Sequence, residues 1–426
     1  MRIGDILRVF RACLGCSLAA VLAGSAAAPY RRAAAPSFPS TSPTCDPDNA
    51  GLALPAGFCA VLVAQGLDAP RHLAVAPNGD VFVALYGRAG GVLALRDTDG
   101  DGRADRRELT PVGGGNGIAL TADHLYFATD AAILRWGWSP GQLKPAGEPE
   151  QVVRDLPTHG NHTSKSVAVG PDGSIYVNVG SATNSCQRAD RRPLSPGIDP
   201  CSELNTRAGI WRFAPDRLQQ TQGDGTHYAT GLRNTIALAF DPASGLLYGA
   251  THGRDQLGDN WGFSDRDNAE KPAEEFGQIR EGSDFGWPYC FYDPLARKKV
   301  LAPEYGGDGV RIGRCASKQD PLIGFPGHWG PMAIAFYHGT QFPAPYAGGA
   351  FIAFHGSWNR APLRQAGFRV VFAPFKGGKP TGTWETFATL AGQPTDFRPS
   401  GLAIGPDGSL YISADENGKV WRVMKQ

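Results

Sequence analysis

One phrase recurs six times along the chain and constrains its fold more than any other feature. Each copy has small and branched apolar residues, then a turn, then an alternating strand, as in RHLAVAPNGDVFVAL and RPSGLAIGPDGSLYISAD. Turns such as PNG and PDG supply Asn, Asp or Gly where the backbone needs a positive φ, so each copy predicts a β-hairpin. The copies begin at Arg71, Asn116, Lys165, Arg233, Gly330 and Arg398.

Further strand-like segments follow most copies, among them GGVLALRD, GIWRFAP and GKVWRV. The copies begin 45 to 97 residues apart, at or above the ~40–50 residues of a four-stranded blade, so the long intervals carry inserted loops. We predict an all-β, single-domain, six-bladed β-propeller over residues 45–426. A strand near Phe58 to Val63 joins the last blade and closes the ring. A pair of β-sandwiches is the alternative, but sandwiches do not require six copies of one phrase.

Composition agrees with this fold and excludes some partners. The 56 glycines and 34 prolines suit many short strands joined by tight turns. Lys and Arg together number 41 and Asp and Glu 40. No overall field therefore attracts nucleic acid or an anionic membrane, and any basic binding site must be local.

Residues 1–28 have the layout of a secretory signal peptide. Three arginines precede an apolar stretch of small residues from Ala12 to Ala26, and a run of alanines ends at Ala28. A permanent membrane anchor is the alternative, but the stretch is shorter than the ~20 residues that span a bilayer. Residues 29–44, rich in Pro, Ser and Ala, predict a disordered linker. We expect a periplasmic or secreted protein without a stable membrane span.

Cysteine usage is typical of an exported protein. Six cysteines lie beyond the expected signal, an even number that suits three disulfides in an oxidising compartment. Cys13 and Cys16, inside the signal, are followed by Ser rather than the His of a c-type haem site. Pairing between neighbours in sequence is one hypothesis among many connectivities, and it joins Cys45 to Cys59, Cys186 to Cys201 and Cys290 to Cys315.

Residues just before the inner strands of a propeller meet at one mouth of its central channel. Several arginines there imply an anionic ligand with many acceptor oxygens, because guanidinium groups bind carboxylates or phosphates bidentately. A single such arginine is usually a solvated cap or ion-pair member, and a lone loop histidine is usually a surface residue. Convergence favours a binding site and makes His162 the best general-base candidate. The converging residues are Arg71, Asn161, His162, Arg233, Asn234, His328 and Arg398, with Arg360 after the fifth inner hairpin.

From about Leu54 to its C-terminus the chain resembles a known family. HGNHTSKSVAVGPDGSIYVNVG, GLRN, GRDQLGDN, SDFGWPYC and HGSWNR look like the PQQ-dependent soluble glucose/sorbosone dehydrogenases, nearer the sorbosone branch. PDG turns occur in many propellers, whereas GLRN followed by GRDQLGDN and GWPYC is a specific combination.

The resemblance implies oxidation of a sugar hydroxyl by bound pyrroloquinoline quinone (PQQ), a planar tricarboxylate, with Ca²⁺ at its quinone edge. His162 aligns with the base that takes the hydroxyl proton while the C–H leaves as hydride. Arg233 would stabilise charge on the quinone oxygen, and the backbone carbonyls of Gly253 and Arg254 align with calcium ligands. The residues expected to bind the cofactor are Arg71, Asn161, Asn234, His328, Arg360 and Arg398.

Three positions depart from the glucose branch of that family. The residue before the base is Asn161 instead of Asp. A cofactor-binding Lys has no Lys in register, where the chain has Ser357 to Arg360. Arg398 aligns with the first of two C-terminal arginines, and Ser400 replaces the second. These departures bear on substrate and affinity.

An acidic loop, DTDGDGRADRRE, gives a second and independent metal signal. It matches a 12-residue calcium loop, with its glycine at the sharp turn. An acidic surface turn is the alternative, and no flanking helix pair suggests a full EF-hand. We predict a structural Ca²⁺ site whose ligand positions are Asp97, Asp99, Asp101, Arg103 through its backbone, Asp105 and Glu108.

Two other functions compete with the dehydrogenase. A propeller lactonase would hold a central Ca²⁺ with carboxylates and amides, for which Asp255 and Asp259 are candidates, although arginines at the mouth argue against it. A binding propeller without chemistry would be favoured if His162 and Arg233 lay apart. The sequence leaves open the sugar, the oligomeric state and the electron acceptor, a quinone or a cytochrome.

Overall fold

The computed structural model describes residues 43–392 and 394–426. The expected signal peptide, nearly all of the expected linker, and Cys13 with Cys16 lie outside the described residues. Within the part that is described, no helix is long and apolar enough to span a bilayer.

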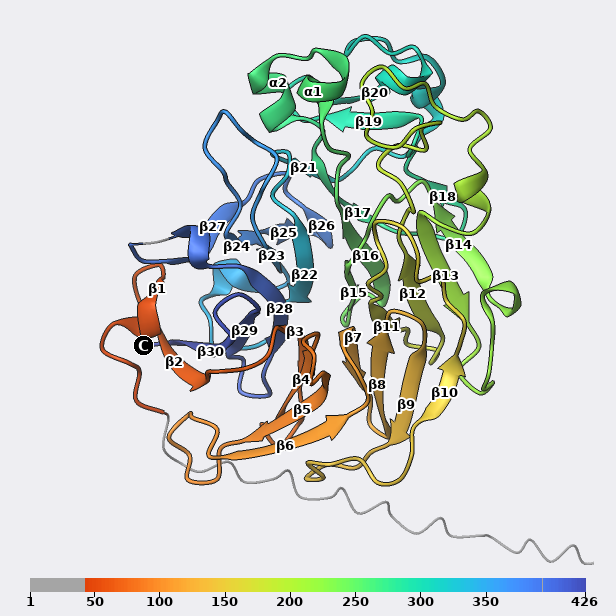
Figure 1. Ribbon diagram of the computed structural model, residues 1–426. Coiled ribbons are helices and arrows are strands. Elements are labelled where there is room, and N and C mark those ends of the chain that lie inside the picture. The colour runs from red at the N-terminus through yellow and green to blue at the C-terminus, as the bar shows by residue number, and fades with distance from the viewer. Residues whose placement is uncertain (1–42, 393) are drawn as a thin grey trace, which may run out of the picture. The chain divides into compact units, whose positions relative to one another are not determined.

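Six sheets of four or five strands surround a central axis (Figure 1), which confirms the predicted six-bladed β-propeller. The first strand of each blade lines the channel, and the following strands lie progressively outward. Blade 1 contains β3 (Pro70–Val75), β4 (Val81–Leu85), β5 (Gly91–Arg96) and β6 (Arg106–Pro111), and blade 2 contains β7 (Gly115–Leu120), β8 (His124–Thr129), β9 (Ile133–Gly137) and β10 (Glu150–Val153). Blade 3 contains β11 (Val167–Val169), β12 (Ile175–Val179), β13 (Gly209–Phe213), β14 (Thr226–Thr230) and β18 (Ser283–Asp284), and blade 4 contains β15 (Ala237–Asp241), β16 (Leu246–Thr251), β17 (Glu274–Gln278) and β21 (Ile323–Phe325). Blade 5 contains β22 (Pro331–Phe336), β23 (Ala350–Phe354), β24 (Arg369–Ala373), β27 (Glu385–Leu390) and β1 (Leu52–Ala53), and blade 6 contains β28 (Pro399–Ile404), β29 (Leu410–Ala414), β30 (Lys419–Lys425) and β2 (Phe58–Ala64).

The ring closes through the N-terminal strand, as predicted. β2 pairs antiparallel with β30, the last strand of the chain, so blade 6 joins both ends of the propeller. β1 pairs with β27 of blade 5, an addition that the sequence did not predict. The three disulfides join Cys45 to Cys59, Cys186 to Cys201 and Cys290 to Cys315, which agrees with the hypothesis of pairing between neighbours in sequence.

The long intervals between repeats hold inserted segments. In blade 4 the insertion includes α1 (Leu257–Trp261), α2 (Asp265–Glu270), β19 (Cys290–Asp293) and β20 (Lys298–Leu301). These elements gather beyond blade 4, at the top of Figure 1. Blade 5 carries the small hairpin of β25 (Phe375–Lys376) and β26 (Lys379–Pro380). Short 3₁₀ turns complete the chain: η1 (Asn49–Gly51), η2 (Ser202–Asn205), η3 (Gln222–Asp224), η4 (Pro303–Tyr305), η5 (Gly313–Ser317), η6 (Ala344–Tyr346) and η7 (Pro394–Asp396).

Each pair of adjacent blades encloses its own apolar cluster, six in all. The strand alternation places one face of every sheet against each neighbouring blade, so middle strands such as β4 are buried along their whole length. Between blades 5 and 6, the ring of Phe58 meets those of Phe342 and Phe387 edge to face at 4.8 and 5.1 Å. These interfaces fix the blades, and with them the loops at the channel mouth.

Candidate active site at the channel mouth

The inner strands enclose an axial cavity of about 250 Å³ to which all six blades contribute residues. Buried and partly buried hydrogen bonds join residues of different blades at or near the mouth. Four of them run from Ser or His side chains to backbone carbonyls of another blade and one joins two side chains, so the blades are held close together there. The bonds are Ser400 Oγ to Pro70 O (2.7 Å), Asn116 Nδ2 to Ser166 Oγ (3.3 Å), Ser166 Oγ to Ile236 O (2.5 Å), His252 Nε2 to Pro331 O (2.7 Å) and His72 Nε2 to Met332 O (2.7 Å).

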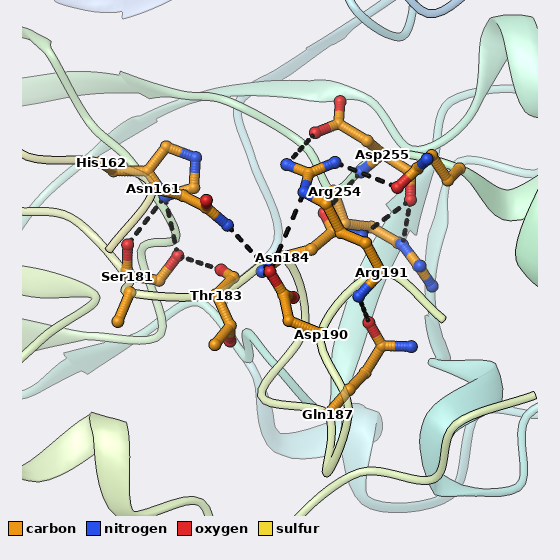
Figure 2. Close-up of polar contacts among 12 residues, drawn as sticks. Asn161, His162, Ser181, Thr183, Asn184, Gln187, Asp190, Arg191, Arg254 and Asp255 are labelled. Carbon is orange, nitrogen blue, oxygen red and sulfur yellow. Dashed lines mark hydrogen bonds and ion pairs between the residues drawn. The ribbon is translucent and has the colours of Figure 1, made fainter. Parts of the chain in front are cut away.

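His162 lies in the loop before β11, and one of its ring nitrogens is fixed. Its Nδ1 is 2.9 Å from the carbonyl oxygen of Ser181 (Figure 2), while the hydroxyl of Ser181 donates to the Thr183 carbonyl at 2.7 Å. Because a carbonyl only accepts, Nδ1 carries the proton and Nε2 has a free lone pair. Burial, then the charges of Arg233 and His252, lowers the pKa of His162 well below its ordinary value. His162 is therefore a neutral imidazole able to accept a proton at Nε2.

Asn161 beside it is held by the disulfide loop 186–201. Its Nδ2 donates to Asp190 Oδ2 at 3.1 Å, and the other carboxylate oxygen of Asp190 accepts the Asn184 backbone N–H at 2.9 Å (Figure 2). The inserted loop of blade 3 thus positions the loop that carries His162.

Arg233 is buried, and acceptors of the protein surround its guanidinium. Nη2 donates to Asp255 Oδ2 and to Asn184 Oδ1, both at 3.0 Å. Nε donates to the Asn184 carbonyl at 3.1 Å and Nη1 to the Gly253 carbonyl at 2.8 Å. Asn184 also accepts the backbone N–H of Asp255 at 2.9 Å, so one asparagine orients both members of the ion pair.

The Asp255 carboxylate is shared by two guanidinium groups. Arg191, from the disulfide loop, donates to the same oxygen as Arg233 at 3.0 Å, and His328 Nδ1 lies 3.6 Å from the other oxygen. Burial alone would raise the pKa of Asp255, but Arg233, His328 and Arg191 outweigh it and hold that pKa far below its usual range. The residue is a fixed anion inside the wall of the site.

The two expected calcium-binding carbonyls belong to this same wall. The Gly253 carbonyl already accepts from Arg233, and the Gly253 N–H donates to Glu274 at 3.1 Å. Burial raises the pKa of Glu274 to about 7. The Arg254 side chain turns away into a buried ion pair with Glu304, 2.7 Å from nitrogen to oxygen.

A second carboxylate cluster lies across the mouth in blades 1, 5 and 6. Asp415 pairs with Arg71 at 3.2 Å and with His355 Nε2 at 2.9 Å. Arg398 Nη1 is 3.4 Å from the His355 carbonyl, and its Nε is 3.9 Å from Glu416. The Arg71 and Arg398 side chains are 21% and 26% exposed. Unlike Arg233, these two arginines can still offer donors to a ligand.

Several buried polar atoms at the mouth have no hydrogen-bond partner among residues 43–392 and 394–426. Asn234 Oδ1 and His328 Nδ1 are two of them, on the side of His162 and Arg233, and Arg71 Nε and Asn116 Oδ1 are two more at the mouth; the other ring nitrogen of His328 donates to the Asn268 carbonyl at 2.7 Å. Buried polar atoms are nearly always paired, so an unpaired cluster marks a place that a bound molecule or water completes.

Arg360 has a different role from the one the sequence suggested. Its side chain is only 7% exposed. It donates to the carbonyls of Ala269 and Gly327 and pairs with Glu270 at 2.5 Å. Since these acceptors use its donors, Arg360 ties the blade 5 loop to the blade 4 insertion and presents no free guanidinium edge to a ligand.

A family model described as TrAA12-like matches residues 52–426. The chain belongs to the TrAA12-like family. The resemblance to PQQ-dependent sugar dehydrogenases found in the sequence is thereby confirmed at the level of the family. A curated relative named pyrroloquinoline quinone-dependent pyranose dehydrogenase, from Coprinopsis cinerea, is 24% identical over 418 residues, covering 87% of this chain and 54% of that protein. The chain spans about half the length of the curated relatives it matches.

Two solved structures share the fold of this TrAA12-like chain. The calcium structure of the Trichoderma reesei family AA12 protein has a TM-score of 0.73 at 20% identity, covering 88% of this chain and 97% of that one. The holo form of the pyranose dehydrogenase PQQ domain from Coprinopsis cinerea has a TM-score of 0.72 at 19% identity, covering 91% and 99%.

The acidic loop of this TrAA12-like propeller joins β5 to β6, at the end of blade 1 away from the mouth. It brings together the oxygens of Asp97, Asp99 and Asp101, all within 4.8 Å of one another. Asp105 instead accepts from the Thr98 backbone at 3.1 Å. Glu108, on β6, pairs with Arg106 at 3.2 Å. The first three predicted side-chain ligands thus converge, whereas Asp105 is used by Thr98 and Glu108 belongs to strand β6.

Sequence reasoning missed several polar residues of the TrAA12-like site. They stand after the second strand of a blade or in an inserted loop, whereas the repeat pattern predicts mouth residues before the first strand; these residues are Asn184, Arg191, His252, His355 and Asp415. The ends of second strands reach the same mouth, so THGRD, HGSWNR and SADENG carried a usable signal.

Proposed function

We propose that this chain is a PQQ-dependent oxidoreductase acting on the CH–OH group of an aldose or sugar aldehyde. The observation that carries the proposal is His162, a neutral imidazole with a free Nε2, placed beside Arg233 at a mouth lined with arginines. The names of the Coprinopsis cinerea relative and of its PQQ domain support it.

The mouth fits an anion such as PQQ. Arg71 and Arg398 keep exposed edges that can bind carboxylates, and Asn234 and His328 offer unpaired buried atoms. When bound, the quinone would accept the two electrons of the sugar C–H bond as a hydride. His162 Nε2 would take the hydroxyl proton. Arg233, held rigidly by Asn184 and Asp255, would supply a positive charge beside the reacting atoms.

Calcium fits less well at the carbonyls of Gly253 and Arg254. The guanidinium groups of Arg191 and Arg233 both hold the Asp255 carboxylate, and Arg233 already donates to the Gly253 carbonyl. A divalent cation there would meet like charge, so no step of the reaction is assigned to calcium. We place the better calcium candidate at Asp97, Asp99 and Asp101, as a structural site.

The competing functions have less support. A lactonase needs several carboxylates free to grip a metal, but Asp255 is held by arginines and Asp259 is exposed on α1. A binding propeller without chemistry would be favoured if His162 and Arg233 lay apart. Arg233 instead lies close enough to lower the pKa of His162. Export is part of the proposal, supported by the three disulfides. The acceptor would be a quinone or a cytochrome.

The test is a calorimetric titration of the protein with PQQ, with and without Ca²⁺, followed by dye reduction with a panel of aldoses. We expect saturable binding and sugar-dependent reduction that the His162→Ala variant loses while still binding PQQ. Absence of PQQ binding under both conditions would reject the proposal, and lactone hydrolysis would be assayed next.

A further inference from the structure

One aromatic side chain is exposed at the rim of the site. Trp358 is 64% exposed, and it is the only exposed Phe, Tyr or Trp in the described part of the chain. Its neighbours Ser357, Asn359 and Arg360 are all buried. The loop therefore turns a single large ring outward from a buried backbone.

That loop is anchored on both sides of the ring. Ser357 exchanges bonds with the end of its own loop, its N–H donating to the Ala366 carbonyl at 2.8 Å and its Oγ to Gln365 at 2.7 Å. On the other side, the Asn359 carbonyl accepts from Asn268 at 3.3 Å. Arg360 adds the bonds to the blade 4 insertion described above. Trp358 is therefore exposed on a loop that is already fixed, so binding a ligand to its ring costs little conformational entropy of the loop.

Arg191 connects this ring to the site. Its guanidinium carbon lies over the Trp358 ring, 6.0 Å from the ring centre, while its Nη2 donates to Asp255 at 3.0 Å. Its Nε is 4.0 Å from Asp190, too far for a hydrogen bond, and the side chain is 28% exposed. Because Nη1 also donates, to Gln256 Oε1 at 3.1 Å, Nε is the donor that remains for a ligand beside the exposed aromatic ring.

We propose that Trp358 and Arg191 form a binding subsite for a second pyranose unit, so that the substrate is an oligosaccharide rather than a free monosaccharide. The apolar face of a pyranose ring suits a flat, exposed indole, and the free Arg191 N–H suits a sugar hydroxyl. Trp358 contacts Arg191, Arg191 contacts Asp255, and Asp255 contacts Arg233, so we assign the second unit to Trp358 and the reacting unit to His162. The inference rests on the proposed sugar dehydrogenase function.

The experiment measures binding and turnover separately. Calorimetric or NMR titrations of the protein without PQQ use cellotetraose, maltotetraose and xylotetraose, with glucose as the single-unit comparison. The variants are Trp358→Ala, Trp358→Phe as the conservative rescue, and Leu246→Ala as a matched control. Leu246 is an exposed apolar residue at the opposite end of blade 4. The same proteins are then loaded with PQQ, and kcat/KM is compared for the tetraoses and glucose.

We expect at least one tetraose to bind more tightly than glucose. Trp358→Ala should weaken that binding by about tenfold or more, because the indole face is the main apolar contact proposed for the second unit. Trp358→Phe should retain part of the affinity, and Leu246→Ala should match the wild type. With PQQ, the ratio of kcat/KM for that tetraose to kcat/KM for glucose should be lower in Trp358→Ala than in the wild type.

Equal binding of glucose and all tetraoses, or unchanged tetraose binding in Trp358→Ala, would overturn the inference. Tetraose binding that depends on Trp358 without oxidation of any sugar would refute only the proposed dehydrogenase.

Discussion

Arg233 and Asp255 form a buried ion pair, 3.0 Å from nitrogen to oxygen, in which each charge compensates the other. Burial lowers the pKa of Arg233, and Asp255 opposes that effect most strongly. Neither group is exposed enough for water to replace its partner. The pair therefore fixes the guanidinium that stands beside His162.

Removing the charge of Asp255 is expected to destabilise the protein strongly. Asp255→Asn leaves Arg233 and Arg191 without their shared counter-charge, and breaking a buried pair in this way costs about 3–5 kcal/mol. Urea denaturation measures the change in the free energy of unfolding. The matched control is Asp259→Asn on the exposed face of α1, which should stay within about 0.5 kcal/mol of the wild type. Equal stability of the two variants would show that the ion pair does not hold the wall.

The pH dependence of turnover reports on His162. Because burial, Arg233 and His252 lower its pKa, the imidazole stays neutral below the ordinary histidine range. We expect kcat/KM to show no loss with an apparent pKa near 6.5, and to fall only at lower pH, where Nε2 becomes protonated. His162→Gln should reduce kcat by about 10²-fold or more, with PQQ affinity retained. A profile that falls through pH 6.5 in the wild type but not in His162→Gln would contradict this picture.

Repetition made most of the fold predictable, because six copies of one hairpin fix the number of blades and identify the strand that lines the channel. The site was predictable only in part. His162 and Arg233 were found because they precede inner strands, and Arg71 because it stands at the start of one. The position of Arg360 in the sequence did not reveal that its guanidinium would donate to backbone carbonyls of blade 4 and so be occupied. These contacts arise between inserted loops of different blades, and no local pattern in the sequence encodes which loops meet.

Ser400 shows how a departure from a family pattern can have a structural reason. The resemblance to the family places an arginine at this position. In the structure its Oγ donates to the Pro70 carbonyl at 2.7 Å, across the junction of blades 6 and 1. The Ser400 side chain has no exposed surface, so a larger arginine side chain at this position would have to displace its neighbours.

Lys165 is expected to make the stability of the protein vary with pH in the alkaline range. The residue is fully buried, its ammonium donates to the carbonyls of Pro157 and Thr163, and burial lowers its pKa from 10.5 to about 8. Between these two values the unfolded chain binds a proton that the folded chain does not. Its contribution to the free energy of unfolding therefore rises from pH 8 to 10.5, by up to about 3 kcal/mol.

The measurement compares the wild type with Lys165→Met by urea denaturation across that range. Other groups titrate there too, so the difference between the two proteins is the quantity of interest. We expect the wild type to gain stability relative to Lys165→Met as the pH rises. Parallel curves would mean that the ammonium is not desolvated.

Calcium is expected to stabilise the protein through the β5–β6 loop. A ligand that binds only the folded state raises the free energy of unfolding by about 2.7 kcal/mol at a concentration of 100 times Kd. The increase in Tm with Ca²⁺ should disappear in the Asp99→Asn/Asp101→Asn double variant. Glu108→Gln should retain it, because Glu108 pairs with Arg106 outside the cluster. If Glu108→Gln also lost the increase in Tm with Ca²⁺, Glu108 would be a ligand, as the twelve-residue loop predicted from the sequence requires.

Arg398 and Arg360 are expected to separate cofactor affinity from stability. Arg398 is partly exposed and weakly held, so Arg398→Gln should leave Tm nearly unchanged while reducing PQQ affinity by about tenfold, as for one lost charge-assisted bond. Arg360→Gln removes buried bonds to Ala269, Gly327 and Glu270 and should cost about 3 kcal/mol of stability. At a temperature where it is folded, its PQQ affinity should remain close to that of the wild type. The reverse result, with Arg360→Gln folding normally and failing to bind PQQ, would return Arg360 to the cofactor site suggested by the sequence.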